Sequence, residues 1–416
     1  MRFKLLLSVF LILCTCVSYA QTSANADFTK YAAKQDSLMI KAYERKDTAS
    51  YGVLLKDFLS RYEALDEKNK KEFQPVLAGA YYNFACTYSL VQDKENALDY
   101  FDKSVQAGFY NYSHIMKDTD LDFIRNENRF KNLMEKIRGI GDYLYILGRA
   151  GEYNALEKRE LPTFMYQPSD NPHLVELRKA FNLDSIAGHG YEISKFLNMM
   201  HWIHNLIRHD GSIGNPEVRN AMSMINKCKT EKRGLNCRGM AIVLNECYLA
   251  MGFKSRFVTC LPKDSLGIDQ DCHVINMVYS STMKKWLWID PTFDAYVMNE
   301  KGDLLSIEEV RERIINGKPL ILNPDANWNH SSSQTKENYL YTYMAKNLYM
   351  LECPVQSEYN LETKETGKNI EYARLLPLDY FKQEPAVATV ENKESNTKRV
   401  TYMTNNPAAF WAVPNN

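Results

Sequence analysis

The stretch that decides the fold reads Gly234-Leu235-Asn236-Cys237-Arg238-Gly239-Met240-Ala241. Gly234 and Asn236 suit turn and helix-cap positions, so Cys237 is expected to open a helix that runs to Met251 and stops at Gly252. A thiol at a helix start lies near unpaired backbone N–H groups and the positive end of the helix dipole, and both favour the reactive thiolate. Cys237 is therefore a candidate nucleophile.

The chain after this helix has the character of β-strands. Residues 255–259, 273–279 and 286–290 are strand-like, and His273 opens the second run while Asp290 closes the third. Adjacent strands can bring Asp290 beside His273, where a carboxylate orients the imidazole and stabilises its charged form. Cys, His and Asp in this order are the parts of a thiol nucleophile, its base and the group that orients the base. The sequence thus predicts the catalytic residues Cys237, His273 and Asp290, with no metal ion and no cofactor.

These blocks resemble the transglutaminase-like superfamily. The resemblance runs from about Ile193 to Tyr296. It rests on the helix that ends in His209-Asp210-Gly211, on the Cys237 helix, on residues 252–256, on Cys272-His273-Val274 and on residues 286–292. It implies a papain-like arrangement with the Cys on a helix and the His and Asp on neighbouring strands. It also implies that Cys237 is the nucleophile, His273 the general base and acid, and Asp290 the orienting carboxylate.

The resemblance further implies an acyl-enzyme pathway on peptide or protein amides. The thiolate attacks an amide, an amine or ammonia leaves, and a second nucleophile releases the acyl group. Because water is always concentrated outside the cell, hydrolysis by a peptidase or amidase is favoured over crosslinking. One oxyanion donor is expected at the backbone N–H that starts the Cys237 helix, and the sequence does not identify the second. The alternative is an inactive relative that binds peptides or proteins, with Cys237 unreactive or disulfide-bonded.

The first 20 residues have the order of a secretory signal peptide. A basic start is followed by an apolar run and by Ser18-Tyr19-Ala20, which suits cleavage. The protein is therefore expected to be exported to the periplasm or the extracellular space. Lipid anchoring at Cys16 is less favoured than ordinary cleavage, and no later segment is long and uncharged enough to span a membrane.

Charge and cysteine content limit the partners and the redox state. Lys+Arg and Asp+Glu both total 51 in a chain of 416 residues, so the formal net charge is zero and nucleic acid is not expected as a partner. Nine cysteines occur, of which Cys14 and Cys16 fall in the leader, so seven remain. An odd number leaves at least one thiol unpaired within the chain. Cys237 is the candidate, because a nucleophile requires a free thiol.

Composition divides the mature chain into three parts and predicts an α+β fold. Residues 21–145 have the spacing of helical hairpins, and Ala78 to Phe109 resembles a tetratricopeptide repeat, so this part is predicted to be a tetratricopeptide-like helical domain. A protein partner could bind through it, but a structural cap is favoured because a stack this short offers little concave surface. Residues 160–325 are predicted to form the transglutaminase-like catalytic domain with an antiparallel sheet. Residues 326–416 are predicted to form a β-rich extension.

The C-terminal part carries weaker signals. Ser306 and Glu309 predict a capping box at the start of a helix. Tyr339 to Tyr343 is rich in aromatic residues and predicts a strand, as do the surroundings of Val400 and Trp411. Residues 383–398 are polar and are expected to be mobile.

Overall fold

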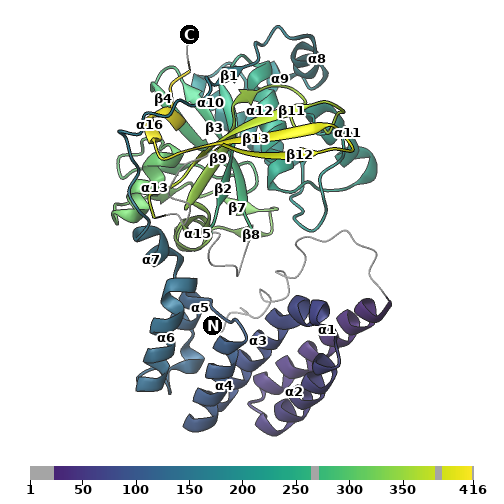
Figure 1. The fold of residues 1–416 in the computed structure, drawn as a ribbon, viewed down its shortest axis with the longest axis vertical. Helices are drawn as coiled ribbons and strands as arrows, with labels where there is room; N and C mark the ends of the chain where they lie inside the picture. The colour runs from purple at the N-terminus through teal and green to yellow at the C-terminus, as the bar shows by residue number, and fades with distance from the viewer. Residues whose placement is uncertain (1–22, 264–270, 380–386, 415–416) are drawn as a thin grey trace. The chain divides into compact units, whose positions relative to one another are not determined.

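The computed structural model describes residues 23–263, 271–379 and 387–414. The chain divides into two compact units, with the boundary between Tyr145 and Ile146 (Figure 1). The predicted signal peptide, including Cys16, lies outside the described residues.

The first unit is helical, as its sequence predicts. Antiparallel helix pairs are capped in turn by Asp47, Asp66 and Asp93, each of which accepts a hydrogen bond from the backbone N–H three residues on. The elements are α1 (Ser23–Glu44), α2 (Thr48–Glu63), α3 (Glu67–Leu90), α4 (Lys94–Gln106), α5 (Tyr112–Lys117), the 3-10 turn Thr119–Leu121, α6 (Asn128–Gly141) and α7 (Tyr143–Gly148), which crosses the boundary. The predicted tetratricopeptide-like repeat falls on α3 and α4, which pack against each other.

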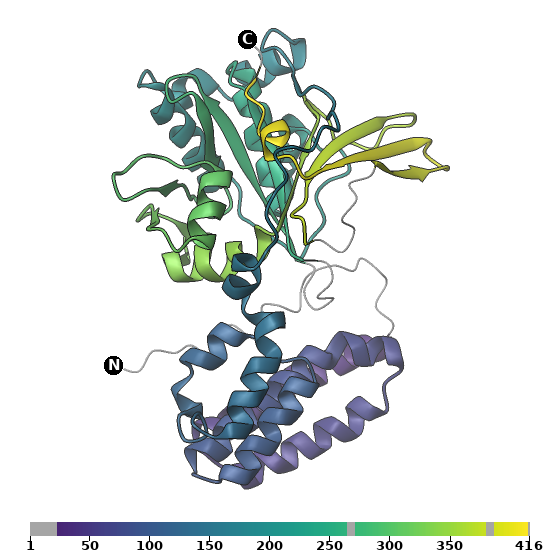
Figure 2. The ribbon, with the colours of Figure 1, turned by 60° about the vertical axis from the view of Figure 1, so that its left-hand side comes forward.

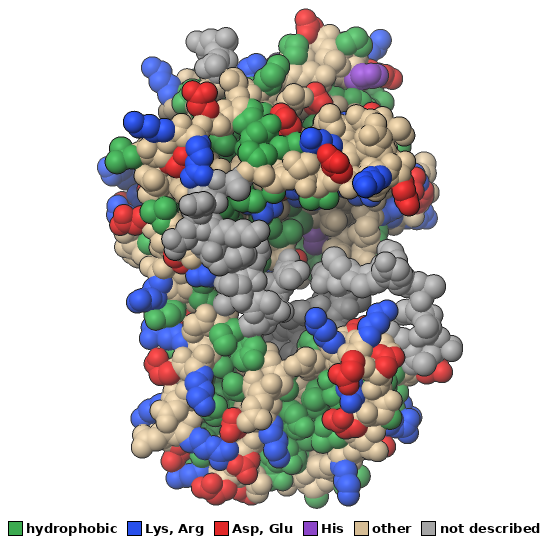
Figure 3. All heavy atoms as spheres, in the orientation of Figure 1, with side chains coloured by type: hydrophobic (Ala, Val, Ile, Leu, Met, Phe, Trp, Pro, Cys, Tyr) green, Lys and Arg blue, Asp and Glu red, His purple; other side chains and the backbone are tan. Residues whose placement is uncertain are grey.

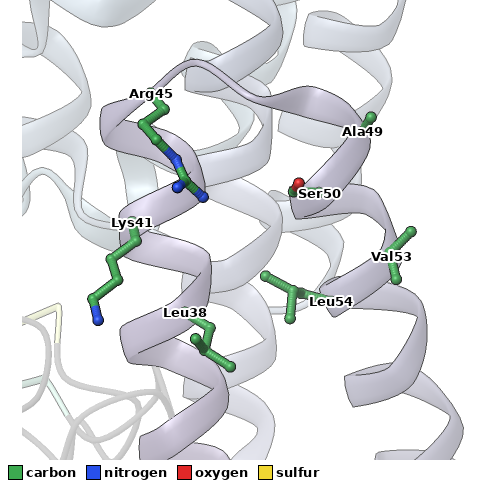
Figure 4. Close-up of a pocket in the computed structure, with 7 residues that line it drawn as sticks. All are labelled: Leu38, Lys41, Arg45, Ala49, Ser50, Val53 and Leu54. Atoms are coloured by element: carbon green, nitrogen blue, oxygen red, sulfur yellow. The ribbon is translucent and has the colours of Figure 1, made fainter.

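A shallow groove lies between α1 and α2 on the surface of this unit (Figure 4). Its volume is about 570 Å³. Lys41 of α1 and Arg45, just after the end of α1, lie at its edge, and Leu38, Val53 and Leu54 form its apolar part. The residues that line this groove belong to the first unit, whereas Cys237 belongs to the second.

The second unit is built around a seven-stranded sheet with the strand order β12-β13-β11-β9-β2-β3-β4. Neighbouring strands are antiparallel, apart from β11 and β13, which are parallel. Figure 2 shows the hairpin of β12 and β13, in yellow, reaching out beyond the helices of the unit. The strands are β2 (Ser255–Leu261), β3 (His273–Ser280), β4 (Lys285–Ile289), β9 (Met350–Pro354), β11 (Asn369–Leu375), β12 (Val387–Asn392) and β13 (Thr397–Thr404).

Short strand pairs and further helices complete this unit. The pairs are β1 (Met165–Tyr166) with β10 (Gln356–Ser357), β5 (Val297–Met298) with β6 (Ile321–Leu322), and β7 (Asn327–Trp328) with β8 (Ser332–Ser333). The helices are α8 (Pro172–Ala180), α9 (Leu183–Ala187), α10 (Glu192–Leu206), α11 (Ala221–Glu231), α12 (Cys237–Ala250), α13 (Ile307–Ile315), α14 (Lys336–Asn338), α15 (Ala345–Asn347) and α16 (Pro407–Phe410).

The core of the second unit forms around α12. Every residue of this helix from Gly239 to Ala250 is buried, and the helix packs against β2 and β3 on one side and α8, α10 and α11 on others. A helix that is mostly apolar is stable only with such enclosure. The α+β prediction is confirmed, as are the helix that begins at Cys237 and the three strands that follow it. The capping box of Ser306 and Glu309 is present at α13.

Three expectations for the C-terminal part are wrong. Tyr339–Met344 is a π-helix, because burial of Tyr339 and Met344 on one side overrides the strand preference of its aromatic residues. Trp411 follows the short helix α16, which Asn406 caps and Pro407 opens. Residues 387–392 are β12, an exposed strand at the edge of the sheet, whereas 383–386 lie outside the described residues.

The described residues hold no helix with both the length and the apolar character needed to cross a membrane. On the face drawn in Figure 3, basic and acidic side chains are interspersed over both units. The C-terminal strands β9, β11, β12 and β13 belong to the same sheet as β2, β3 and β4. The sheet that carries His273 is therefore completed by residues from the end of the chain.

Two glycines of α6 give a matched test of the helical unit. A Cβ on Gly141 would lie 1.6 Å from the backbone oxygen of Tyr110, whereas one on Gly139 would meet no atom within 4 Å. We expect Gly141→Ala to lower the melting temperature because backbone must move. Gly139→Ala should raise stability by up to about 1 kcal/mol, because alanine loses less conformational entropy in a helix. Calorimetry measures both, and equal effects of the two changes would contradict this packing.

Candidate active site

Cys237 is the first residue of α12, and Asn236 is its N-cap. The side-chain oxygen of Asn236 accepts the N–H of Gly239 at 3.1 Å, and its backbone oxygen accepts that of Met240 at 3.1 Å. Among the described residues, nothing accepts a hydrogen bond from the backbone N–H of Cys237. The helix start therefore presents a free donor beside the thiol, as the sequence predicts.

A close side-chain contact fixes the turn before Cys237. Asn215 donates from Nδ2 to Oδ1 of Asn236 at 2.7 Å and accepts the Asn236 N–H at 3.2 Å. A Cβ on Gly239 would lie 2.5 Å from Oδ1 of Asn215, so a side chain at this position would displace Asn215. The Asn236 turn and Gly239 are thus both required for the position of the thiol.

The sheet register brings His273 and Asp290 together. Asn276 pairs with Ile289, so one step further along the ladder Asp290 stands opposite Ile275, on the face that His273 shares. Nε2 of His273 lies 2.7 Å from Oδ2 of Asp290, and the side chains are 1% and 0% exposed. The structure thus makes the neighbouring pair that the strand pattern predicts.

Asp290 is held by four donors. Its Oδ1 accepts the backbone N–H groups of Thr292 at 2.9 Å and Phe293 at 3.3 Å. Its Oδ2 accepts His273 and also the hydroxyl of Tyr339 at 2.6 Å. The Tyr339 oxygen accepts Nε1–H of Trp288 at 3.3 Å, so its own proton is directed to Asp290. The carboxylate is therefore fixed in rotation and fully hydrogen-bonded.

His273, the partner of Asp290, and Cys237 carry opposite charges near neutral pH. Burial acts to lower the pKa of His273, but the charge and the hydrogen bond of Asp290, followed by those of Cys237, raise it to about 10. Burial acts to raise the pKa of the Cys237 thiol, but hydrogen bonds from His209 and His273 and the charge of His273 lower it to about 6. A thiolate and an imidazolium are the forms that result.

Contact between His273 and Cys237 is looser than contact between His273 and Asp290. Nδ1 of His273 is buried and makes no hydrogen bond of ordinary geometry to any described residue. The rings of Phe293 and Tyr343 flank the imidazole edge-on at 5.4 and 5.2 Å. Nδ1 is thus available to bond the thiol or a reacting group. Contacts between a catalytic base and its partner commonly shorten when substrate binds.

The C-terminal strands support the nucleophile through Arg238. Its Nη2 donates to Oγ1 of Thr259 at 2.8 Å, and its Nη1 forms an ion pair with Glu362. Glu362 also accepts the hydroxyl of Tyr372, from β11, at 2.6 Å. The start of α12 is therefore tied to both β2 and β11.

His209 is a site residue that the sequence does not reveal, because there it reads only as the end of a helix. It forms a parallel bridge with Leu235, in which Leu235 donates to the Arg208 oxygen at 3.1 Å and Asp210 donates to the Leu235 oxygen at 2.7 Å. This bridge lies two residues before Cys237 and brings the His209 side chain to the thiol. The sequence does not reveal Tyr339 as a site residue either, because its surroundings have a pattern typical of a strand.

The described cysteines are all free thiols, and Cys237 differs from the others in its pKa. Burial raises the pKa of Cys272 and of Cys353 to about 11 in each case, and it also raises the pKa values of Cys86, Cys228, Cys247 and Cys260. Within the described ranges no group of three or more His, Cys, Asp and Glu side chains is placed to hold a metal ion.

Comparisons with known proteins agree with the resemblance. Residues 179–291, which include Cys237, His273 and Asp290, match the model of the Transglutaminase-like superfamily. The resemblance is thereby confirmed for this segment, and it supports a cysteine enzyme as the class of protein.

One solved structure, a "Putative Cysteine Protease from Cytophaga hutchinsonii", is 19% identical over 32% of this chain and 46% of that one, with a TM-score of 0.23. The match thus spans less than half of that protein's length. No curated protein matches the chain.

Alkylation by iodoacetamide tests the charge state of the thiol. We expect the labelling rate at Cys237 to rise with pH through an inflection near 6 and then to level off, because the rate follows the thiolate fraction. In His273→Gln the inflection should move to higher pH, because one hydrogen bond and one positive charge are lost. Mass spectrometry of the labelled peptides gives the rates.

Cys272 is the internal control for this measurement. Its thiol should label slowly up to about pH 9, because burial raises its pKa to about 11. A wild-type inflection at Cys237 above pH 8, near the ordinary value of a free thiol, would contradict the pairing with His273 and His209.

Proposed function

We propose that this protein is an exported cysteine hydrolase that cleaves peptide or protein amide bonds with Cys237, His273 and Asp290. The observation that carries the proposal is the buried His273–Asp290 pair, 2.7 Å apart, beside a thiol whose pKa is lowered to about 6. The match of residues 179–291 to the transglutaminase-like superfamily agrees with this chemistry.

Acylation is the first half of the proposed reaction. The Cys237 thiolate attacks the amide carbonyl carbon, a C–S bond forms, and the carbonyl π electrons move to oxygen. The tetrahedral intermediate collapses, the C–N bond breaks, and the imidazolium of His273 gives its Nδ1 proton to the leaving amine. A thioester on Cys237 and a neutral His273 remain.

Deacylation restores the starting state. Neutral His273 accepts a proton from water through Nδ1, and the resulting oxygen nucleophile attacks the thioester. Collapse of the second tetrahedral intermediate breaks the C–S bond, releases a carboxylic acid and returns thiolate and imidazolium. Asp290 stabilises the charge on His273 in both half-reactions and keeps Nε2–H directed to itself.

Hydrolysis is proposed over amine transfer because water needs no binding site to reach a high concentration. Export is proposed because residues 1–20 have the pattern of a signal peptide. An exported amidase meets peptides and proteins as substrates. The helical unit is proposed to contribute a protein-binding surface, supported by the resemblance of α3 and α4 to a tetratricopeptide repeat.

The fate of a defined acyl group tests hydrolysis against transfer. 4-Nitrophenyl acetate acetylates an activated cysteine, and the acetyl group then leaves either as acetate or as an amide of added monodansylcadaverine. We expect acetate to be the main product at millimolar amine. Water, at about 55 M, competes with the amine for the acetyl group, and the proposed enzyme has no binding site for an amine. Mass spectrometry and fluorescence measure the two products and the acetyl-Cys237 peptide.

Controls for this experiment follow from the roles of the residues. Cys237→Ala should abolish acetylation at this position with the circular dichroism spectrum unchanged. Asp290→Asn should slow both half-reactions, since the imidazolium loses its counter-charge. A dominant amide product would replace hydrolysis by amine transfer, and unchanged turnover in Cys237→Ala would contradict a cysteine enzyme.

A further inference from the structure

The hairpin of β7 and β8 holds His209 at three points. Asn329 accepts the His209 backbone N–H on Oδ1 at 2.7 Å and donates from Nδ2 to the His209 backbone oxygen at 2.9 Å. Trp328 donates its indole Nε1–H to Nδ1 of His209 at 3.1 Å. Asn329 and His330 have φ values of 52° and 57°, the left-handed backbone that a tight hairpin requires. His209 is therefore fixed in both position and ring rotation.

The contact with Trp328 determines the tautomer of His209. An indole N–H can only donate, so Nδ1 of His209 must be the unprotonated, accepting nitrogen. The imidazole proton is then on Nε2 and the ring is neutral. His273 has the opposite assignment, since Asp290 holds the proton on its Nε2 and stabilises the charged ring. Two histidines beside one thiol are thus set to different charge states.

Nε2–H of His209 is the one polar group of this residue that the fold does not use. The backbone groups are bonded to Asn329 and Nδ1 to Trp328, and among the described residues the partner left for Nε2–H is the sulfur of Cys237. A histidine that only supports packing would bond both ring nitrogens to the fold, as His204 does to Pro291 and Asn327. The His209 donor is instead directed into the reaction site.

We propose that His209 is a catalytic residue that donates from Nε2–H to the oxyanion of each tetrahedral intermediate, together with the backbone N–H of Cys237. This inference rests on the proposed acyl-transfer function and deepens it. As the C–S bond forms, negative charge develops on the carbonyl oxygen next to the sulfur, where both donors lie. No proton is transferred: His209 stays neutral and stabilises the charge by a hydrogen bond.

Two reactions of the same thiol separate this role from a general effect on Cys237. Acetylation by 4-nitrophenyl acetate passes through an oxyanion, whereas alkylation by iodoacetamide is a direct displacement that forms none. Both rates scale with the thiolate fraction, so their ratio at one pH cancels any change in the thiol pKa. The ratio is measured at pH 8.5 by mass spectrometry of the Cys237 peptide in the full-length protein.

Removal of the donor should reduce this ratio. We expect His209→Leu to lower the acetylation-to-alkylation ratio by about 100-fold, the usual effect of losing one oxyanion donor, and His209→Gln, which keeps an N–H, to lower it by less than about tenfold. Trp328→Phe should give an intermediate loss, because the tautomer is no longer fixed. His173→Leu, on the exposed surface of α8, is the matched control and should leave the ratio unchanged.

The outcomes distinguish this inference from the proposed function. If His209→Leu or Trp328→Phe lowers both rates in parallel, His209 acts only on the thiolate or on folding and the oxyanion role is overturned, while the nucleophile stands. If wild-type Cys237 is alkylated but not acetylated, both the oxyanion role and the acyl-transfer function are overturned. A selective loss of acetylation that His209→Gln largely restores supports the proposal.

Discussion

The buried ion pair of His273 and Asp290 is the interaction on which the rest of the site depends. Removal of two charges from water costs several kcal/mol for each ion, and the cost is offset only when every lone pair has a donor. Asp290 meets this condition with the backbone of Thr292 and Phe293, the His273 ring and the Tyr339 hydroxyl. The turn after β4 and the π-helix are therefore arranged around one carboxylate.

The nucleophile is positioned by backbone contacts rather than by apolar packing alone. A Cβ on Gly234 would lie 2.4 Å from the Arg208 oxygen, so only a glycine allows the bridge that joins Leu235 to His209. The same bridge places His209 beside Cys237 without any large side chain between them. Both histidines thus extend to the thiol from rigid backbone, His273 from the sheet and His209 from this bridge. Catalysis requires this kind of preorganisation.

Much of this site is predictable from sequence because its parts are local. The cap at Asn236, the stop at Gly252 and the strand that ends at Ile289, just before Asp290, are each specified within a few residues, so the predicted positions of Cys237 and His273 agree with the structure. Tyr339 and His209 could not be predicted in this way. Their roles depend on contacts to Asp290 and Trp328, 49 and 119 residues away, which no short-range period encodes.

The C-terminal part shows a second limit of local patterns. The aromatic residues of Tyr339–Met344 satisfy a strand preference, but the packing of Tyr339 under Asp290 makes this segment a π-helix, a form that often occurs at functional sites. The composition of residues 383–398 suits a mobile loop, yet β12, within this segment, pairs with β13 along its whole length. Propensity describes a residue's average environment, whereas the conformation of these two segments is determined by their contacts with Asp290 and with β13.

The place of β9 in the sheet has a consequence for how the protein acquires its structure. This strand pairs with β2 on one side and β11 on the other. In the first pairing Thr259 of β2 stands opposite Glu352 of β9, which comes far later in the chain. Until β9 arrives, β2 is an open sheet edge, and such edges pair readily with other chains. Loop-closure entropy makes contacts of this separation slow to form. At this sheet the helix and strands that carry the thiol and its base are therefore synthesised first, and the edge of β2 stays open until the later strand β9 pairs with it.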